Sequence, residues 1–192
     1  PWYDADVAGH RRCFDSDSIK GLSFLPQSVV IVGGGIIAVE FARIFSQLKA
    51  KVTMVVRSPN LAISLKRVGI DPELAAVLQA DLLLEGVEIL FEAEVAGGGL
   101  VAKEPSAGVG RRGRDREPLV VNIVKSGSKE INRYTARLPT DLVLTATGRR
   151  AVTDGIGLEA LGIEIAKNGD VAVGADLMTA ALRELGYPAA VA

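Results

Sequence analysis

The chain of 192 residues has few of the side chains that most often carry redox, metal or covalent chemistry. It contains one cysteine, Cys13, and one histidine, His10. A single cysteine excludes an intrachain disulfide, a C-x-x-C redox pair and a cysteine-rich metal site. A single histidine without further ligands nearby cannot anchor a metal ion. We therefore interpret Cys13 and His10 as structural or incidental residues, and we predict no metal site.

Long hydrophobic runs are also absent. No uninterrupted apolar stretch approaches the roughly 20 residues of a membrane span, and the N-terminus carries no signal-peptide pattern. Hydrophobic residues make up 48% of the chain, charged residues 23%, and the net charge is −1. These values are ordinary for a globular domain, so we expect no membrane partner and a cytoplasmic location, with an organelle as the alternative.

Aromatic residues make up only 5% of the chain. None of them lies in residues 96–118, a stretch rich in glycine that also contains a cluster of arginines (Arg111, Arg112, Arg114 and Arg116). Binding of a single nucleic-acid strand would call for aromatic side chains between these cations, on which bases can stack. We therefore predict a mobile, solvated hairpin loop at 96–118, and no nucleic-acid partner.

The most informative stretch of the sequence is 28–57. Residues 28–32 are an apolar, β-branched run that predicts a strand, and Gly33-Gly34-Gly35-Ile36-Ile37-Ala38 follows at once and fits the pattern G-x-G-x-x-G/A. A helix from Ile36 to about Leu48 and a second strand at 51–57 complete a parallel βαβ unit. One helix face carries large apolar residues, which we expect to pack on the sheet. They are Ile37, Phe41, Ile44, Phe45 and Leu48.

This glycine turn has the residue types that a dinucleotide site needs. Gly33 permits a tight turn, Gly35 lets the backbone approach a pyrophosphate, and the small Ala38 lets the helix lie close to the strand. The free N–H groups and the positive dipole end of the helix would face the phosphates. The sequence therefore predicts a dinucleotide site, the alternative being a glycine-rich turn without a ligand.

The end of the second strand indicates which dinucleotide is bound. NAD(H) sites place an acid there to bind the ribose 2′-hydroxyl, whereas NADP(H) sites place a cation there for the 2′-phosphate. This chain has Arg57, and no acidic residue occurs between Glu40 and Asp71. We therefore expect a preference for NADP(H), with NAD(H) as the alternative if Arg57 is only a solvated charge.

The rest of the chain predicts an α/β fold. Asp71-Pro72 is typical of a helix start, residues 87–91 predict a third strand, 119–124 and 131–134 a hairpin, and 141–147 a last strand. We expect a Rossmann-like parallel sheet with helices on both faces and an antiparallel excursion. Upstream, Asp17 or Ser16 should cap a short helix that Pro26 stops.

Several motifs occur in the order found in one family. They are residues 15–19 (Asp-Ser-Asp-Ser-Ile), the glycine turn and helix at 32–42, the strand and Gly-Arg at 141–149, and the segments 157–163 and 169–173. In this order the chain resembles the flavin-dependent pyridine nucleotide-disulfide oxidoreductases, which include glutathione reductase, dihydrolipoamide dehydrogenase and soluble pyridine nucleotide transhydrogenase. Residues 15–19 are most similar to the transhydrogenase.

The resemblance implies specific site residues. Gly33, Gly35 and Ala38 would contact the pyrophosphate, Gly148 would close over the nucleotide, and Arg57 matches the arginine of NADPH-using members. A second arginine a few residues later is not found, since Ile63 and its neighbours are apolar. The expected nicotinamide contacts lie on the first turns of the helix. They are Ile36, which would gate the pocket, and Glu40, whose alternative is an ordinary helix carboxylate. Ile37 is a further expected cofactor contact.

The resemblance also implies what a complete family member would contain. It would bind FAD, form a homodimer and transfer hydride between nicotinamide and flavin. This sequence has no second glycine motif for the flavin and no C-x-x-x-x-C pair. We therefore expect a fragment, with a lead-in from a flavin domain at 1–27, a nicotinamide dinucleotide-binding domain at 28–149 and a return toward the flavin domain at 150–192. The alternative is an isolated Rossmann domain that binds NADP(H) without catalysis.

Overall fold

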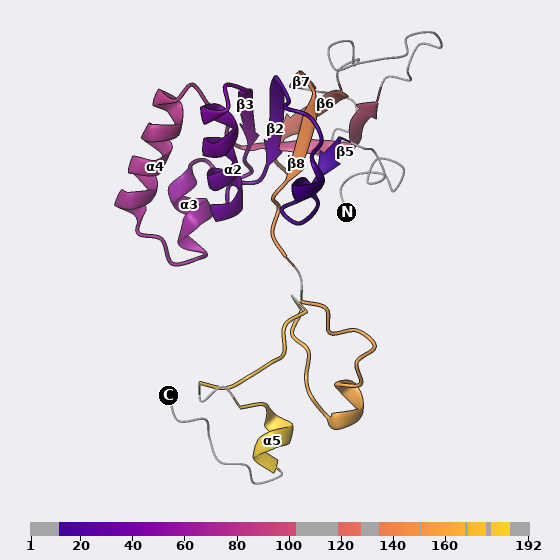
Figure 1. Ribbon diagram of the computed structural model, residues 1–192. Coiled ribbons are helices and arrows are strands. Elements are labelled where there is room, and N and C mark those ends of the chain that lie inside the picture. Colours follow the sequence, from indigo (N-terminus) through magenta and orange to yellow (C-terminus); the bar gives the residue numbers. More distant parts are fainter. Residues whose placement is uncertain are drawn as a thin grey trace. The chain divides into compact units, whose positions relative to one another are not determined.

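The computed structural model describes residues 12–102, 119–127, 135–149, 151–167, 169–175 and 178–184 (Figure 1). The chain divides into two units, Pro1–Thr147 and Gly148–Ala192, and each is described by itself. His10, the arginine cluster and the predicted strand at 131–134 lie outside the described residues.

The first unit is built on a five-stranded parallel sheet. Its three central strands are short runs of mainly β-branched and other apolar residues, which favour the extended backbone and are buried on both faces. In spatial order the five strands are β1 (Cys13–Phe14), β8 (Leu142–Thr145), β2 (Ser28–Val32), β3 (Lys51–Val55) and β4 (Glu88–Leu90). The predicted parallel βαβ unit is confirmed, because β2 and β3 pair in parallel from Ser28–Lys51 to Val32–Val55.

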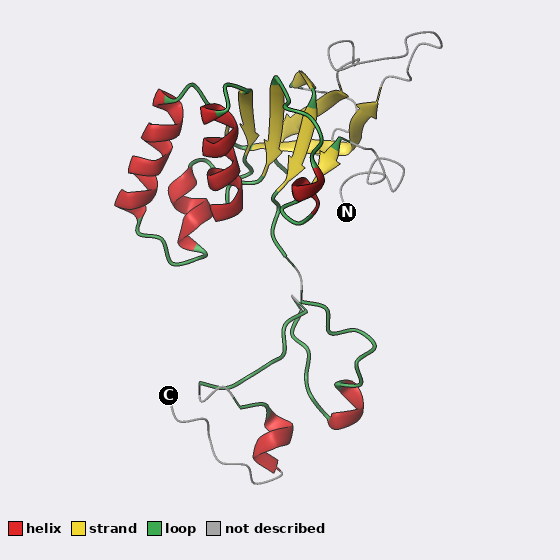
Figure 2. Cartoon of the chain, viewed as in Figure 1, coloured by secondary structure: helices red, strands yellow, loops and turns green. Residues whose placement is uncertain are grey.

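Different layers cover the two faces of this sheet (Figure 2). Val29 and Ile31 of β2 pack in one core cluster with the helices, whereas Val30 and Val32 pack in a second cluster with an antiparallel sheet. The Rossmann-like sheet and its antiparallel excursion are therefore as expected, but the described helices lie on one face instead of both. The helices of this face are α2 (Ile36–Gln47), α3 (Leu61–Lys66) and α4 (Pro72–Leu84).

Helix α2 packs on the sheet through only part of the predicted apolar stripe, because Phe45 is buried and Phe41 is partly buried against the same core cluster. Ile37, Ile44 and Leu48 are 38%, 47% and 48% exposed. The sheet is contacted instead by a face with small residues, which allows the helix axis to approach the strands. The buried residues of α2 are Ala38, Val39, Ala42 and Phe45. Phe45 is therefore the one member of the predicted stripe that is buried.

Helices α3 and α4 begin at residues whose side chains cap them. The Asp71 side chain accepts a hydrogen bond of 2.8 Å from the Glu73 N–H, with Pro72 as the first helical residue, so the predicted start of α4 is confirmed. Helix α3 was not predicted, and its Asn60 cap accepts a bond of 2.9 Å from the Ile63 N–H.

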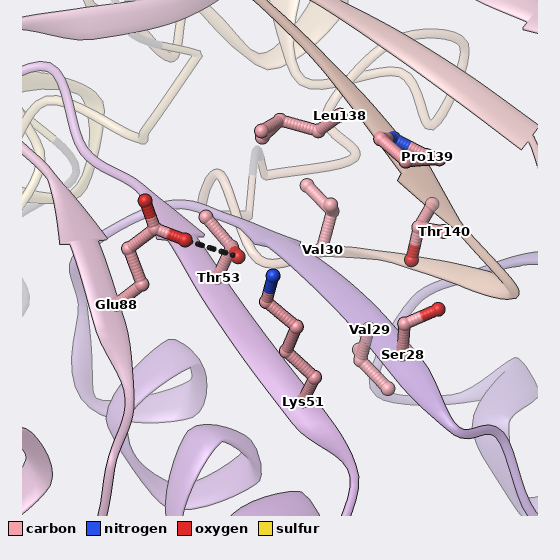
Figure 3. Close-up of a pocket in the computed structure, with 9 residues that line it drawn as sticks. All are labelled: Ser28, Val29, Val30, Lys51, Thr53, Glu88, Leu138, Pro139 and Thr140. Carbon is pink, nitrogen blue, oxygen red and sulfur yellow. Dashed lines mark hydrogen bonds between the residues drawn. The ribbon is translucent and has the colours of Figure 1, made fainter.

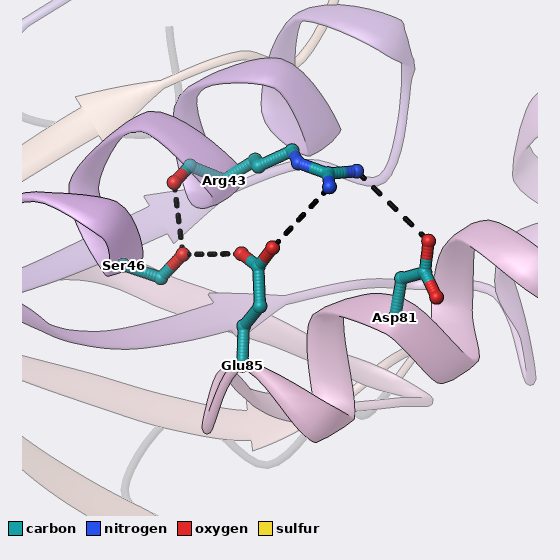
Figure 4. A network of polar contacts seen from close by, with 4 residues as sticks. All are labelled: Arg43, Ser46, Asp81 and Glu85. Atoms are coloured by element: carbon teal, nitrogen blue, oxygen red, sulfur yellow. Dashed lines mark hydrogen bonds and ion pairs between the residues drawn. The ribbon is translucent and has the colours of Figure 1, made fainter.

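A polar network joins α2 to α4 (Figure 4). The Arg43 guanidinium lies 3.9 Å from Asp81 and 3.4 Å from Glu85, and the Ser46 hydroxyl donates to Glu85 at 2.7 Å. These side chains are solvent-accessible, so the ion pairs contribute little to stability. Together with the Ser46 hydrogen bond, these ion pairs define which side of α2 faces α4.

The antiparallel sheet has the order β5-β6-β7. Strand β5 extends into the stretch that we predicted as a loop, so residues 96–102 are a strand, and the remaining 103–118 lie outside the described residues. The register between β5 and β6 shifts between Val95 and Leu100, where a bulge accommodates the glycines. Because these glycines interrupt the pattern typical of a strand, the sequence alone does not indicate one here. The bounds are β5 (Ala93–Ala102), β6 (Leu119–Lys125) and β7 (Ala136–Thr140).

The segment before β2 belongs to the same sheet, because β1 pairs with β8. The helix that follows is a single 3-10 turn, η1 (Ser18–Gly21). Asp15, not Asp17 or Ser16, supports it by accepting hydrogen bonds from the Asp17 N–H at 3.1 Å and the Ser18 N–H at 2.7 Å. Bonding to Ser18 keeps the pKa of Asp15 below its usual value.

The second unit contains η2 (Glu159–Leu161), α5 (Ala180–Glu184) and a bridge between Ile165 and Val171. The buried Thr153 hydroxyl donates to the Gly169 carbonyl at 3.0 Å. Across both units, no described helix has the length and apolar character needed to cross a bilayer.

Cys13 on β1 is expected to be an unreactive thiol. Burial, and then the negative charge of Asp15, raises the pKa of Cys13 from 9.0 to about 11. Because the thiolate is the reactive form, alkylation by iodoacetamide at pH 8 should be about 10- to 100-fold slower in the folded protein than in urea. Equal rates would contradict this.

The raised pKa of Cys13 also makes the stability of the fold depend on pH. As the pH rises, the thiol loses its proton in the unfolded chain before it does so in the folded protein. The stability contribution of Cys13 is therefore present below pH 9 and is lost as the pH rises towards about 11.

Candidate nucleotide site

The candidate site lies at the carboxyl edge of the parallel sheet. From β2 the chain crosses to β3 on one side, while β8 lies on the other side of β2, so Gly33–Gly35 follow the strand at a topological switch point. Ligands of open α/β sheets bind at such points.

The chain directly after β8 lies so close to position 33 that only glycine fits there. Its N–H donates to the Val55 carbonyl at 2.9 Å, and its φ is +131°. A Cβ at this position would lie 2.2 Å from the Ala146 carbonyl oxygen. The first glycine of the motif therefore permits the close approach of two backbones.

Gly34 packs against α3. A Cβ on Gly34 would lie 2.7 Å from the Ser64 Oγ and 2.7 Å from the Val56 Cγ1. The pattern G-x-G-x-x-G/A assigns no role to this residue, because it occupies a variable position. The positions of Val56 after β3 and of α3, a helix without a clear sequence signal, show why it is glycine.

Gly35 has a different environment. Apart from its chain neighbours, no described residue has an atom within 4 Å of the place where its Cβ would be, so this side of the turn is open in the described part of the chain. Gly35 is also the N-cap of α2, and no side chain caps this helix. An uncapped helix start with open space beside it fits a pyrophosphate, which would accept from the N–H groups of the first turn.

The predicted contacts on α2 fall into two groups. Ile36 and Ile37 are 39% and 38% exposed at the open end of the helix, and Glu40 is exposed one turn later. Ala38 is fully buried in the core, so its side chain serves the close packing of α2 on the sheet. A direct contact between the Ala38 side chain and a ligand is not supported by this burial.

Arg57 is exposed directly after β3, at the same edge as the glycine turn. No ion pair or side-chain hydrogen bond holds it among the described residues. The backbone around it is fixed, because the Val56 carbonyl accepts from Ala93 at 3.0 Å and the Ser58 carbonyl accepts from Glu92 at 3.2 Å. The arrangement presents a free cation on an anchored loop.

Gly148, the last predicted contact, begins the second unit and has φ +109°. Its contact with a nucleotide stays a prediction.

A pocket elsewhere in the first unit is not this site (Figure 3). It lies at the amino ends of β2, β3 and β4 beside β7, where Thr53 donates to Glu88 at 3.1 Å. Its volume is about 70 Å³. Sites for drug-sized ligands typically measure about 300–1,000 Å³, so the pocket is too small for a dinucleotide.

Comparison with known proteins agrees with this geometry. The family described as "Pyridine nucleotide-disulphide oxidoreductase" matches residues 4–183. The chain is 30% identical over 164 residues to dihydrolipoyl dehydrogenase of Synechocystis, covering 85% of this chain and 30% of that protein. It is 31% identical over 181 residues to soluble pyridine nucleotide transhydrogenase of Klebsiella pneumoniae, covering 94% of this chain and 33% of that protein.

Among solved structures, the HOCl-induced flavoprotein disulfide reductase RclA of Escherichia coli is similar in fold. The TM-score is 0.67 at 27% sequence identity, over 91% of this chain and 34% of that one. The chain thus spans about a third of the length of these relatives.

Proposed function

The chain belongs to the pyridine nucleotide-disulfide oxidoreductase family, and we propose that its glycine turn binds the pyrophosphate of a nicotinamide dinucleotide. The observation that carries the proposal is the open space at Gly35 beside the uncapped start of α2. Gly33 and Gly34 shape the turn through contacts within the protein, whereas Gly35 leaves room for a ligand.

We propose further that the chain is the nicotinamide-binding part of an FAD-dependent oxidoreductase. In such a protein the flavin exchanges a hydride with the nicotinamide. Ile36, Ile37 and Glu40 of this chain would line the nicotinamide end. The described residues form one strand–glycine turn–helix unit, which we assign to the nicotinamide dinucleotide, and we assign no flavin contact to them. The homodimer of a complete family member stays a prediction.

Binding is tested by titrating the purified chain with NADPH and NADH in a calorimeter. We expect saturable binding of at least one of them. No binding of either at millimolar concentrations would contradict the proposal. Absorbance in the flavin region and NAD(P)H-dependent reductase activity separate the two functional alternatives, since a chain that binds dinucleotide without flavin or activity is a binding module.

We propose that the preferred dinucleotide is NADP(H), because Arg57 is a free, exposed cation at the strand end that selects the ribose substituent. An arginine can bind a 2′-phosphate through paired hydrogen bonds, and these charge-assisted bonds are stronger than those to a neutral hydroxyl.

Arg57→Glu is expected to reverse this preference. The carboxylate would repel the 2′-phosphate and accept from the 2′-hydroxyl of NADH, so the ratio of the two dissociation constants should change by roughly 10- to 100-fold toward NADH. Calorimetric titration with both dinucleotides measures the ratio. Arg67→Glu, which makes the same charge change at the exposed end of α3, is the matched control and should leave the ratio unchanged. An unchanged ratio in Arg57→Glu would overturn the NADP(H) proposal.

A further inference from the structure

One side chain, Ser64 of α3, connects the loop that carries Arg57 to the glycine turn. A Cβ on Gly34 would lie 2.7 Å from the Ser64 Oγ, so the turn packs directly on this side chain. The Ser64 Oγ also lies within hydrogen-bonding distance of the Ser58 Oγ, and Ser58 follows Arg57. Ser64 therefore contacts both parts of the proposed nucleotide site.

The direction of the bond between the two serines follows from counting protons. The Ser58 hydroxyl donates to the Asn60 carbonyl at 2.9 Å. A hydroxyl carries one proton, so Ser58 accepts in its contact with Ser64, and the Ser64 hydroxyl is the donor. The Ser64 proton is used within the protein and is not available to a ligand. Its role is therefore positional.

Ser64 stands on a fixed support. Leu61 and Leu65 of α3 are 0% and 1% exposed in the core, and the Leu61 N–H donates to the Gln79 side chain of α4 at 3.1 Å. The backbone of this helix cannot move without disturbing the core. The contact between the Ser64 and Ser58 hydroxyls thus holds the loop after β3 in a fixed position relative to α3.

We infer that Ser64 is a positioning residue for dinucleotide selection. It holds Arg57 at a set distance from the phosphate turn, so that the 2′-phosphate and the pyrophosphate of one NADP(H) molecule are bound together. The benefit is preorganisation of the distance between the two contacts, so that a ligand with both phosphate groups binds without the cost of adjusting the loop to the turn. This inference rests on the proposed function, and it adds a residue that touches neither phosphate.

Ser64→Ala is expected to uncouple the contact of Arg57 with the 2′-phosphate from the contact of the glycine turn with the pyrophosphate. The dissociation constant of NADPH should rise roughly three- to tenfold, the effect of one lost hydrogen bond, while that of NADH changes by less than about twofold. Adenosine 2′-phosphate, which contains the 2′-phosphate but no pyrophosphate, should bind the variant as it binds the wild type, because Arg57 itself is retained. A merely structural weakening would lower the affinity for all three ligands alike.

Two further variants sharpen the experiment. Ser46→Ala is the matched control, because it removes a hydroxyl bonded to the Arg43 carbonyl and to Glu85 at the other end of α2, and it should leave all three affinities unchanged. Ser58→Ala removes the other half of the pair. The double variant Ser58→Ala/Ser64→Ala should bind NADPH as tightly as the single variant with the lower affinity, since the one hydrogen bond between these residues cannot be lost twice.

The outcomes separate this inference from the function on which it rests. If the wild type binds neither dinucleotide, the proposed function fails. If the wild type prefers NADPH and Ser64→Ala keeps that preference, the inference alone is overturned. Additive losses in the double variant, or equal weakening of NADPH, NADH and adenosine 2′-phosphate in Ser64→Ala, would overturn it as well.

Discussion

Gly35→Asp is expected to abolish dinucleotide binding while making the protein more stable. Gly35 has φ −82° and ψ −178°, an extended conformation that suits an aspartate N-cap. The new carboxylate would accept from the first N–H groups of α2 and interact with the positive end of its dipole, stabilising the fold by about 0.5–1 kcal/mol. It would occupy the place proposed for the pyrophosphate and repel it.

We expect at least a roughly 100-fold loss of affinity for NADPH and NADH alike, since a repelling charge replaces favourable phosphate contacts. Calorimetry measures the affinity and urea unfolding the stability. Gly35→Asn provides the neutral control, because it caps the helix without the charge and should weaken binding less. Unchanged affinity in Gly35→Asp would show that the dinucleotide does not bind at this helix start.

Gains in stability with loss of binding are uncommon among substitutions, because most changes destabilise a protein. The expected combination follows from the uncapped start of α2. A helix of 12 residues without a side-chain cap leaves its first N–H groups to solvent or to a ligand. The same feature that lowers the stability of the helix would thus serve the binding of an anion.

The sequence predicted those parts of the fold that depend on short-range chemistry. The β2–α2–β3 unit is encoded by a β-branched run, a glycine turn and a helical period, all within residues 28–57, and the Asp71 cap of α4 is a signal of three residues. Such signals lie between residues that are close in the sequence, so they can be identified without knowing the long-range contacts. The structure confirmed these elements with small differences at their ends.

Features that depend on packing between distant segments were not predicted. Helix α2 carries apolar residues on more than half of its surface, so periodicity could not tell that Ala38 and Ala42 face the sheet while Ile37 and Ile44 face outward. The second face of the sheet is covered by β5–β7, whose glycines at 97–99 were interpreted as a loop.

The candidate site shows the same division. Gly33, Gly35 and Arg57 could be proposed as site residues from the spacing of the motif, and their roles in binding stay predictions. The contact of Gly34 with Ser64 could not, because it depends on the place of α3, a helix of six residues whose sequence has no marked period. Short helices are poorly encoded, since most of their stability comes from tertiary packing.

Gly33→Ala is expected to have the largest effect on stability, and for a reason distinct from binding. The Cβ would lie 2.2 Å from the Ala146 carbonyl oxygen, which is backbone and cannot rotate away, and the φ of +131° disfavours any side chain. Separating β2 from β8 at this edge would also strain the bond from the Gly33 N–H to Val55. We expect a loss of about 3 kcal/mol or more in the free energy of unfolding, the sum of backbone strain and overpacking.

The comparison with Gly21→Ala isolates this cause. Gly21 lies in η1 with no atom within 4 Å of its Cβ position and no positive φ, so alanine there should change the stability by less than about 0.5 kcal/mol. Urea unfolding of both variants measures the difference. If Gly33→Ala were as stable as Gly21→Ala, the approach of the turn to β8 would not be as close as described. The two outer glycines of the turn would then have separable roles, Gly33 in folding and, as we propose, Gly35 in binding the ligand.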